Sequence, residues 1–185
     1  MNDGAWRTWA PELAADEALA TAVLDAHRTL AEQLARDDPL LNLNPRLTIE
    51  YRALRRIEDW RVLLLLTPWM LARLLFPDRA PDIALPTGWT AVERVGQAYQ
   101  VLGPALRMRL LSQDQLAHLN YHPVLGHYLL QPLCLDMEPY VEGDEVFRAW
   151  SEVIRIRDAN MEQARRDCPL QKEISRRELF SRFRI

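Results

Sequence analysis

The spacing of apolar side chains predicts that the chain begins with a long helix. Between residues 12 and 36 apolar positions return at steps of three and four, which is the period of a helix with one buried face. Pro11 suits the first turn, where its missing N–H has no helical partner to lose, and Asp38-Pro39 ends the pattern. His27 lies on the apolar stripe, so we expect a packed core residue there. The expected core face consists of Leu13, Ala20, Val23, Leu24, His27, Leu30, Ala31 and Leu34.

From Leu47 onward apolar and polar residues alternate, which is the period of a half-buried strand. We expect this strand to cover residues 47–57 and to turn back at Glu58 and Asp59. Residues 60–66 are then the returning strand. Because they are apolar on both faces, we place them in the centre of a sheet that helices cover.

The second half of the chain predicts another hairpin and a final strand. Residues 89–102 and 105–111 are expected to be the arms of the hairpin, because Gly103-Pro104 between them is a turn signal. Residues 113–123 are expected to be an irregular insertion or a short helix. Residues 125–130 are expected to be the last strand, which Pro132 stops.

Together these elements predict an α+β fold with an antiparallel sheet of about five strands. An N-terminal helix precedes the sheet, and a long C-terminal helix follows it, from Asp144 to about Arg166. We expect one domain over residues 1–185, with residues 1–40 as a helical extension and residues 168–185 as a basic tail.

One run of the sequence, residues 63–77, consists mostly of large apolar side chains and contains a proline, Pro68. Pro68 lacks the donor that a central strand needs, so the strand is expected to end there and to leave Trp69 and Met70 near the surface. Such a patch suits contact with another protein, and Met supplies an adaptable surface. The alternative is a strand end whose Trp69 is simply buried. Residues 76–88, which contain three prolines, are expected to be a surface loop.

Composition narrows the class of protein. About half of the 185 residues are apolar and a quarter are charged, as in ordinary globular domains, and six tryptophans favour protein binding. The net charge of −3 lacks the basic footprint of a nucleic-acid-binding protein. Two distant cysteines suit a reduced compartment, the first residues lack the pattern of a secretory signal, and the longest apolar run is too short for a membrane span. We therefore expect a cytoplasmic protein.

Candidate chemistry is sparse. His118, His122 and His127 with Cys134 are residue types that bind zinc or nickel, but Asn120 and the residues after His122 interrupt any helix that would gather them. No nucleophile elbow, phosphate loop or dinucleotide fingerprint is present in the sequence. We therefore predict no catalytic residues, no metal ligands and no cofactor. A metal carrier or small enzyme built on the His118–Cys134 region remains the alternative.

The run Thr67-Pro68-Trp69-Met70-Leu71 resembles the HybE-type assembly chaperones of nickel-iron hydrogenases, in which a strand ends in these five residue types. The resemblance covers roughly residues 40 to 185. His127 stands where family members commonly carry a cysteine, and the segment between Leu111 and Leu125 is longer than in the family. Further matches in the same order are Glu58, Trp60, Glu93-Arg94-Val95-Gly96, Pro132-Leu133, Arg176-Arg177 and Leu179-Phe180.

The resemblance implies a non-enzymatic chaperone that binds an immature nickel-iron hydrogenase subunit during maturation or before export. Other maturation proteins are further expected partners, and a scaffold that binds only those proteins is a second alternative. An acidic stretch over residues 136–145 either meets an arginine-bearing peptide or is a helix N-terminus that favours negative charge. The expected partner-binding residues are Thr67, Pro68, Trp69, Met70, Leu71, Phe76, Arg176, Arg177 and Phe180.

Overall fold

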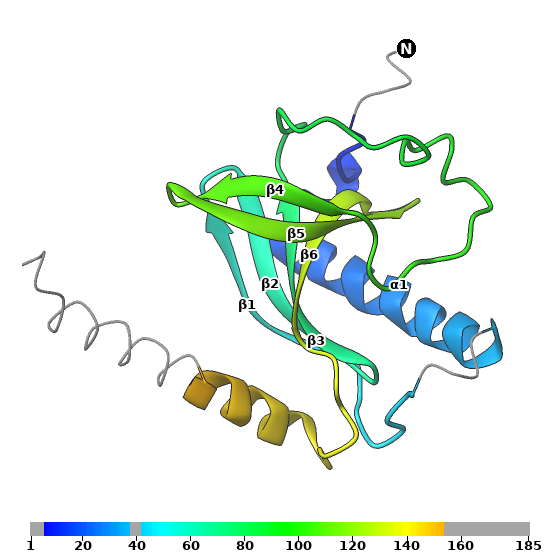
Figure 1. The fold of residues 1–185 in the computed structure, drawn as a ribbon, viewed down its shortest axis with the longest axis vertical. Helices are drawn as coiled ribbons and strands as arrows, with labels where there is room; N and C mark the ends of the chain where they lie inside the picture. Colours follow the sequence, from blue (N-terminus) through cyan, green and yellow to red (C-terminus); the bar gives the residue numbers. More distant parts are fainter. Residues whose placement is uncertain (1–5, 38–41, 154–185) are drawn as a thin grey trace, which may run out of the picture. The chain divides into compact units, whose positions relative to one another are not determined.

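A computed structural model describes residues 6–37 and 42–153, and the chain divides into two compact units, residues 1–143 and 144–185. The first unit is built on a six-stranded antiparallel sheet (Figure 1). Its strands follow the order β1-β2-β3-β6-β5-β4. They are β1 (Glu50–Ile57), β2 (Trp60–Thr67), β3 (Met70–Pro77), β4 (Ala105–Leu110), β5 (Gln113–His122) and β6 (Gly126–Cys134).

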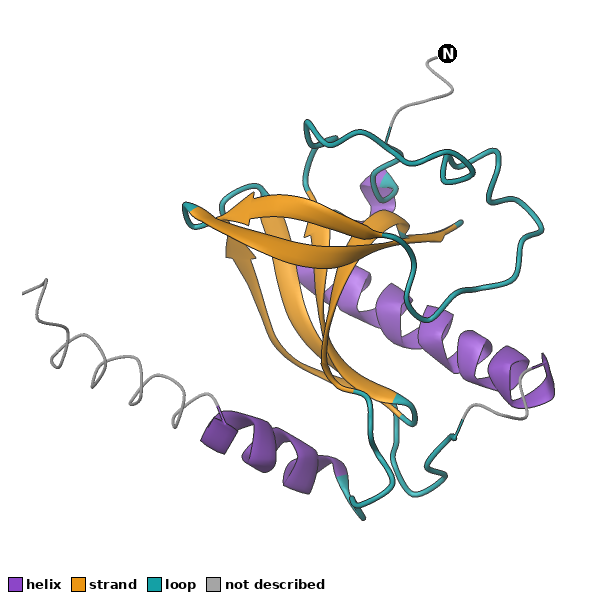
Figure 2. Cartoon of the chain, viewed as in Figure 1, coloured by secondary structure: helices purple, strands orange, loops and turns teal. Residues whose placement is uncertain are grey.

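Successive side chains of the central strands pack into two separate cores, because a strand points alternate residues to opposite faces. On β2, Leu63 and Leu65 join the core cluster that contains the apolar face of the first helix. Trp60 and Val62 join a second cluster with Trp89 and the inner residues of β4 and β5. Figure 2 shows the helix on one side of the sheet. The long loop after β3 contributes to both cores, with Tyr99 against the first cluster and Trp89 in the second. The prediction of a β2 that is buried on both faces is confirmed.

The predicted first helix is confirmed as a short 3₁₀ turn, η1 (Pro11–Leu13), followed by α1 (Asp16–Asp37). Pro11 opens the 3₁₀ turn as expected. His27 is fully buried on the core face of α1, as the apolar period indicated. Arg61 of β2 anchors the start of this region, since its guanidinium contacts Asp78 at 3.1 Å and Asp16 at 3.4 Å and donates to the carbonyl of Leu13.

β2 ends at Thr67, as expected from Pro68, but the chain turns straight back into the sheet, so the expectation that Trp69 and Met70 lie near the surface was wrong. Pro68 and Trp69 form a two-residue turn, and residues 70–77 return as β3 between β2 and β6. The Thr67 hydroxyl closes the turn, because it accepts from the Met70 N–H and donates to the Met70 carbonyl, both at 3.1 Å. Proline is tolerated here because it lies in the turn, outside the ladder of hydrogen bonds.

The second hairpin also differs from the prediction. Residues 89–102 form turns and loop rather than a strand, and β4 pairs instead with β5, over residues predicted to be an insertion or short helix. The turn between them is formed by Leu111 and Ser112, both with positive φ. Two-residue hairpin turns need that conformation, but the residue types that usually signal it are Asn, Asp and Gly. The Gly103-Pro104 signal belongs to the entry into β4.

The last strand passes through Pro132 rather than stopping before it. β6 pairs with β5 only as far as Leu130, while its pairing with β3 continues through Pro132 to Cys134. Pro132 therefore lies where β6 has lost its β5 neighbour, and a missing N–H costs no ladder bond on that side. The register shift opposite Pro132, between Leu71 and Ala72, marks the local irregularity.

A helix follows in residues 143–153. The rest of the predicted C-terminal helix, to Arg166, lies outside the described residues. So does the predicted basic tail over residues 168–185. The expected division into one domain with an N-terminal extension and a C-terminal tail stays a prediction.

Candidate binding pocket

Most of the sequence-predicted partner residues are core residues. Trp69 is 2% exposed, and Thr67, Met70, Leu71 and Phe76 are fully buried. Pro68 is half-buried. The expectation that Trp69 and Met70 lie near the surface is therefore wrong, because β3 inserts them between its neighbours. Arg176, Arg177 and Phe180 lie outside the described residues. The binding role of all nine residues stays a prediction.

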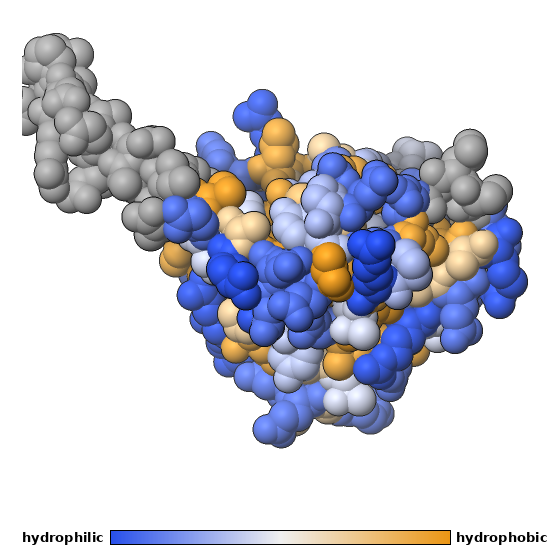
Figure 3. Space-filling model, turned by 90° about the horizontal axis from the view of Figure 1, so that it is seen from below, coloured by the Kyte–Doolittle hydropathy of each residue, from blue (hydrophilic) through white to orange (hydrophobic). Residues whose placement is uncertain are grey.

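The surface offers no broad apolar patch in their place on the face shown in Figure 3, where apolar side chains are interspersed with hydrophilic ones. The exposed large apolar residues come from many different segments, which is normal for a globular protein. A contact site must therefore use shape and polar chemistry as well as apolar area. The residues concerned are Val92, Val95, Leu102, Leu111, Leu116, Val124, Leu135, Val141 and Val153.

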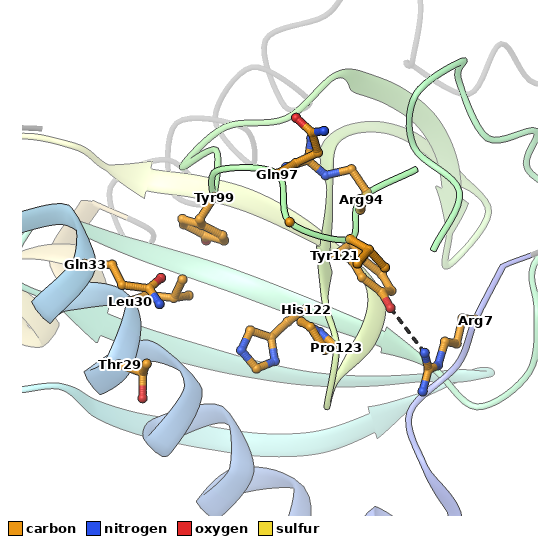
Figure 4. Close-up of a pocket in the computed structure, with 12 residues that line it drawn as sticks. Arg7, Thr29, Leu30, Gln33, Arg94, Gln97, Tyr99, Tyr121, His122 and Pro123 are labelled. Carbon is orange, nitrogen blue, oxygen red and sulfur yellow. Dashed lines mark hydrogen bonds between the residues drawn. The ribbon is translucent and has the colours of Figure 1, made fainter. Parts of the chain in front are cut away.

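A polar pocket of about 410 Å³ lies in the first unit, between α1, the loop that precedes β4 and the turn that joins β5 to β6. Figure 4 shows side chains from these elements facing the same space, with Tyr121 between Arg94 and Arg7. The volume lies within the range of small-ligand and side-chain sites. The lining residues are Arg7, Thr29, Leu30, Gln33, Arg94, Val95, Gly96, Gln97, Tyr99, Tyr121, His122 and Pro123.

A capping box fixes the loop that carries Arg94. The Glu93 carboxylate accepts from both the N–H and the hydroxyl of Thr90, at 3.0 and 2.7 Å, and the Glu93 N–H donates back to that hydroxyl. These bonds hold the pKa of the Glu93 carboxyl below its ordinary value. Gly96 ends the turn in the left-handed conformation that glycine adopts at no steric cost. The acidic side chain of this loop is thus held at Thr90, away from the pocket lining.

Arg94 occupies the pocket wall with its charge only partly compensated. Its guanidinium stacks 4.6 Å from the ring centre of Trp89 and donates to the Ala98 carbonyl at 2.7 Å. Burial lowers the pKa of Arg94 from its ordinary value. Within the described ranges, neither Arg94 nor Arg7 forms an ion pair with a carboxylate, and no Asp or Glu lines this pocket.

His127 ties the N-terminal segment and the Trp89 loop to the end of the sheet. Its Nδ1 accepts from the Arg7 N–H at 2.8 Å, while the His127 N–H donates to the Arg7 carbonyl at 2.7 Å. Its Nε2 donates to the Trp89 carbonyl at 2.8 Å. Burial lowers the pKa of His127, which keeps the ring in the neutral form that Nδ1 needs to accept. His127 therefore positions the backbones of Arg7 and Trp89, and through Trp89 the stacked guanidinium of Arg94.

The remaining polar groups of the pocket also provide hydrogen-bonding atoms. The Tyr121 hydroxyl accepts from the Arg7 guanidinium at 3.3 Å. Nδ1 of His122 accepts from the Val124 N–H, so the proton of the neutral ring lies on Nε2. Burial lowers the pKa of His122. It raises the pKa of Tyr99 to about 12, and the Tyr99 hydroxyl contacts the Tyr128 hydroxyl at 3.4 Å.

The histidines that the sequence offered as metal ligands have other roles in the structure. His118 is bonded through Nδ1 to the Gly103 carbonyl at 2.7 Å, and both ring nitrogens of His127 have backbone partners. In residues 6–37 and 42–153, no three His, Cys, Asp or Glu side chains gather as a group that could hold a metal ion. The same residues contain no helix long and apolar enough to cross a membrane.

Sequence reasoning did not find this pocket. Its one direct signal was the Glu93-Arg94-Val95-Gly96 segment, which was assigned to a hairpin. Arg7 carried a weaker signal, since Trp6 and Trp9 on either side of it are large apolar residues that need cover. Nothing local in the sequence pairs Arg7 with His127, 120 residues later.

Comparison with known proteins gives two matches. The family model described as "[NiFe]-hydrogenase assembly, chaperone, HybE" matches residues 18–182. Among solved structures the chain is similar to the solution structure of HybE from Escherichia coli, with 18% identity, a TM-score of 0.45, and coverage of 84% of this chain and 82% of that one. No curated protein matches the chain.

Proposed function

Because the chain belongs to the HybE family of [NiFe]-hydrogenase assembly chaperones, we propose that it holds one immature hydrogenase subunit in the cytoplasm until that subunit is assembled or exported. The chain is an assembly chaperone and not an enzyme. The observation that carries the proposal is the family match over residues 18–182, which spans both units of the chain. The identity of the subunit and the timing relative to export are the proposed parts.

We place the contact surface elsewhere than in the apolar patch expected from the sequence. Trp69 and its neighbours stabilise the sheet from within, so their apolar area is already used. We propose that the partner meets the polar pocket around Arg94, together with the C-terminal residues Arg176, Arg177 and Phe180. A chaperone must release its client, and polar contacts around a small pocket suit reversible binding better than a large apolar interface.

The test is affinity capture from the native host grown under conditions that express the hydrogenase, with partners identified by mass spectrometry. The bait is the full chain, and a second bait carries Arg176→Gln, Arg177→Gln and Phe180→Ala. We expect the parent to enrich a hydrogenase subunit in stoichiometric amount and the triple variant to enrich it less. Trp69→Ala is unsuitable as a binding variant, because it removes a buried indole from the core.

The result distinguishes the proposal from its alternatives. Enrichment of accessory maturation proteins without any hydrogenase subunit would favour a scaffold and contradict the proposed client. Equal capture of the subunit by both baits would remove the C-terminal residues from the contact while leaving the function intact. Capture of the mature, exported form alone would contradict a role before assembly.

A further inference from the structure

We propose that the pocket around Arg7 and Arg94 binds a carboxylate side chain of an extended acidic segment in the client protein. The identity of the client as a hydrogenase subunit rests on the proposed function, whereas the carboxylate site is inferred from the residues of the pocket. Arg7, Arg94 and the neutral imidazole of His122 line one cavity. Among the described residues, no carboxylate forms an ion pair with either arginine. The planar guanidinium fork matches a carboxylate with two parallel hydrogen bonds.

The positive charge of the pocket has no carboxylate partner among the described residues. The Arg94 guanidinium stacks on Trp89 and donates a hydrogen bond to a neutral carbonyl, that of Ala98. Partial burial lowers the pKa of Arg94, and a nearby anion favours the charged form of such a group. The nearby acid, Glu93, is held in the capping box and leaves the site open. An incoming carboxylate would supply the missing charge.

The lining favours an acidic side chain on a polypeptide over a small inorganic anion. Leu30, Val95 and Pro123 give the pocket apolar walls, and Tyr99 and Tyr121 add ring surface. The apolar side chains and the ring faces offer contacts to the methylenes and neighbouring residues of a peptide that an inorganic anion cannot use. The cavity of about 410 Å³ exceeds the size of a single small anion and accommodates a glutamate side chain with part of its backbone.

The architecture around the pocket fixes the backbone at Arg7 and the ring on which Arg94 stacks without the ligand. His127 fastens the backbone at Arg7 and the carbonyl of Trp89, on which Arg94 stacks. Gly126 allows this docking, since a Cβ there would collide with the Arg7 carbonyl and with Thr8. Preorganised donors bind more tightly than mobile ones, because less side-chain entropy is lost on binding.

The experiment is an NMR titration of the full chain with three N-acetylated tripeptides. One is acetyl-Gly-Glu-Gly-amide, the second has Gln in place of Glu, and the third has Gln with a free C-terminal carboxylate. We expect the glutamyl peptide to shift the resonances of Tyr99, Tyr121 and His122 and to bind at least about tenfold more tightly than the glutaminyl amide. Inorganic phosphate is titrated as a fourth ligand.

The variants Arg94→Gln and Arg7→Gln are each expected to weaken the glutamyl peptide by roughly tenfold. The matched control is Arg109→Gln, the same chemical change on β4. Arg109 lies opposite Asp114 in the register of β4 and β5. Asp114 is eight residues before the pocket residue His122 on β5, so Arg109 lies about 26 Å along the strand from the pocket. We expect this control to bind like the parent. Unchanged amide dispersion checks that each variant folds.

Several results would overturn the inference. They are equal binding of the glutamyl and glutaminyl peptides, tighter binding of phosphate, preference for the free C-terminus, or an equal loss in the Arg109 control. Failure here, with a hydrogenase subunit still captured from the host, would leave the proposed function standing on another surface. Peptide binding without capture of any subunit would leave the carboxylate site standing and the client wrong.

Discussion

Single buried polar residues fix turns and loops of this fold through hydrogen bonds to the backbone. Thr67 closes the β2–β3 turn with one hydroxyl that both accepts and donates. His127 holds two segments with its two ring nitrogens: Nδ1 accepts from the Arg7 N–H, and Nε2 donates to the Trp89 carbonyl. His27 differs from both, because its Nδ1 donates to the Val23 carbonyl at 2.8 Å while its Nε2 has no partner among the described residues. It must therefore stay neutral in the core.

His27 predicts a loss of stability in mild acid. Burial lowers its pKa from 6.5 to about 4, so between these values the unfolded chain binds more protons than the folded one. The free energy of unfolding then falls as the pH drops below 6.5, by about 2 kcal/mol at pH 5 from this residue alone. His27→Leu, which keeps an apolar side chain of similar size, should show a shallower fall in urea unfolding between pH 7 and pH 5. Parallel pH profiles for the two proteins would contradict this explanation.

At the scale of elements, the sequence predicted the helix and the strand whose apolar pattern continues over many residues and whose ends carry the usual turn residues. α1 and β2 fulfil both conditions. β5 was missed because the turn that enters it, Leu111-Ser112, has no Asn or Gly at its centre. β3 was missed although the end of β2 at Pro68 was expected, because the apolar residues after that turn were expected to lie at the surface. Gly103-Pro104 offered a conventional signal at the wrong place. Tertiary pairing fixes these turns, and local residue preference only follows it.

The β4–β5 turn predicts a stabilising substitution. Ser112 has φ +61°, a conformation that costs a residue with a Cβ on the order of 1 kcal/mol and costs glycine nothing. Ser112→Gly is expected to raise the free energy of unfolding by about 0.5–1 kcal/mol, measured by denaturant titration. Ser112→Ala is the control, since it removes the hydroxyl but keeps the strained backbone. A gain in the alanine variant equal to that in the glycine variant would show that strain is not the cause.

At the scale of the whole molecule, the first unit contains a complete fold. All six strands, α1 and every residue of both core clusters fall within residues 1–143. The candidate pocket lies in this unit too. Its position could not be predicted from the sequence, because Arg7, Arg94 and His122 meet only through pairings between segments far apart in the chain.

A chain ending at Gly143 is therefore expected to fold by itself. It should show one cooperative thermal transition and the dispersed amide spectrum of the parent for residues of the sheet, because its cores are intact. It should also retain binding of the glutamyl peptide, since no pocket residue has been removed. A broad, non-cooperative melt, or amide resonances collapsed to the unfolded range, would show that residues beyond Gly143 are required for the sheet to form.

The tie between Arg7 and His127 also sets an order in time. Arg7 is translated 120 residues before its backbone partner His127, which at ordinary rates of translation is a delay of roughly 6–24 s. Throughout that interval the side chains of Trp6 and Trp9 cannot pack against the end of the sheet, because β6 has not yet been made. The segment that carries Arg7 thus docks only after the β5–β6 hairpin has been translated, and one wall of the candidate pocket comes into existence only then.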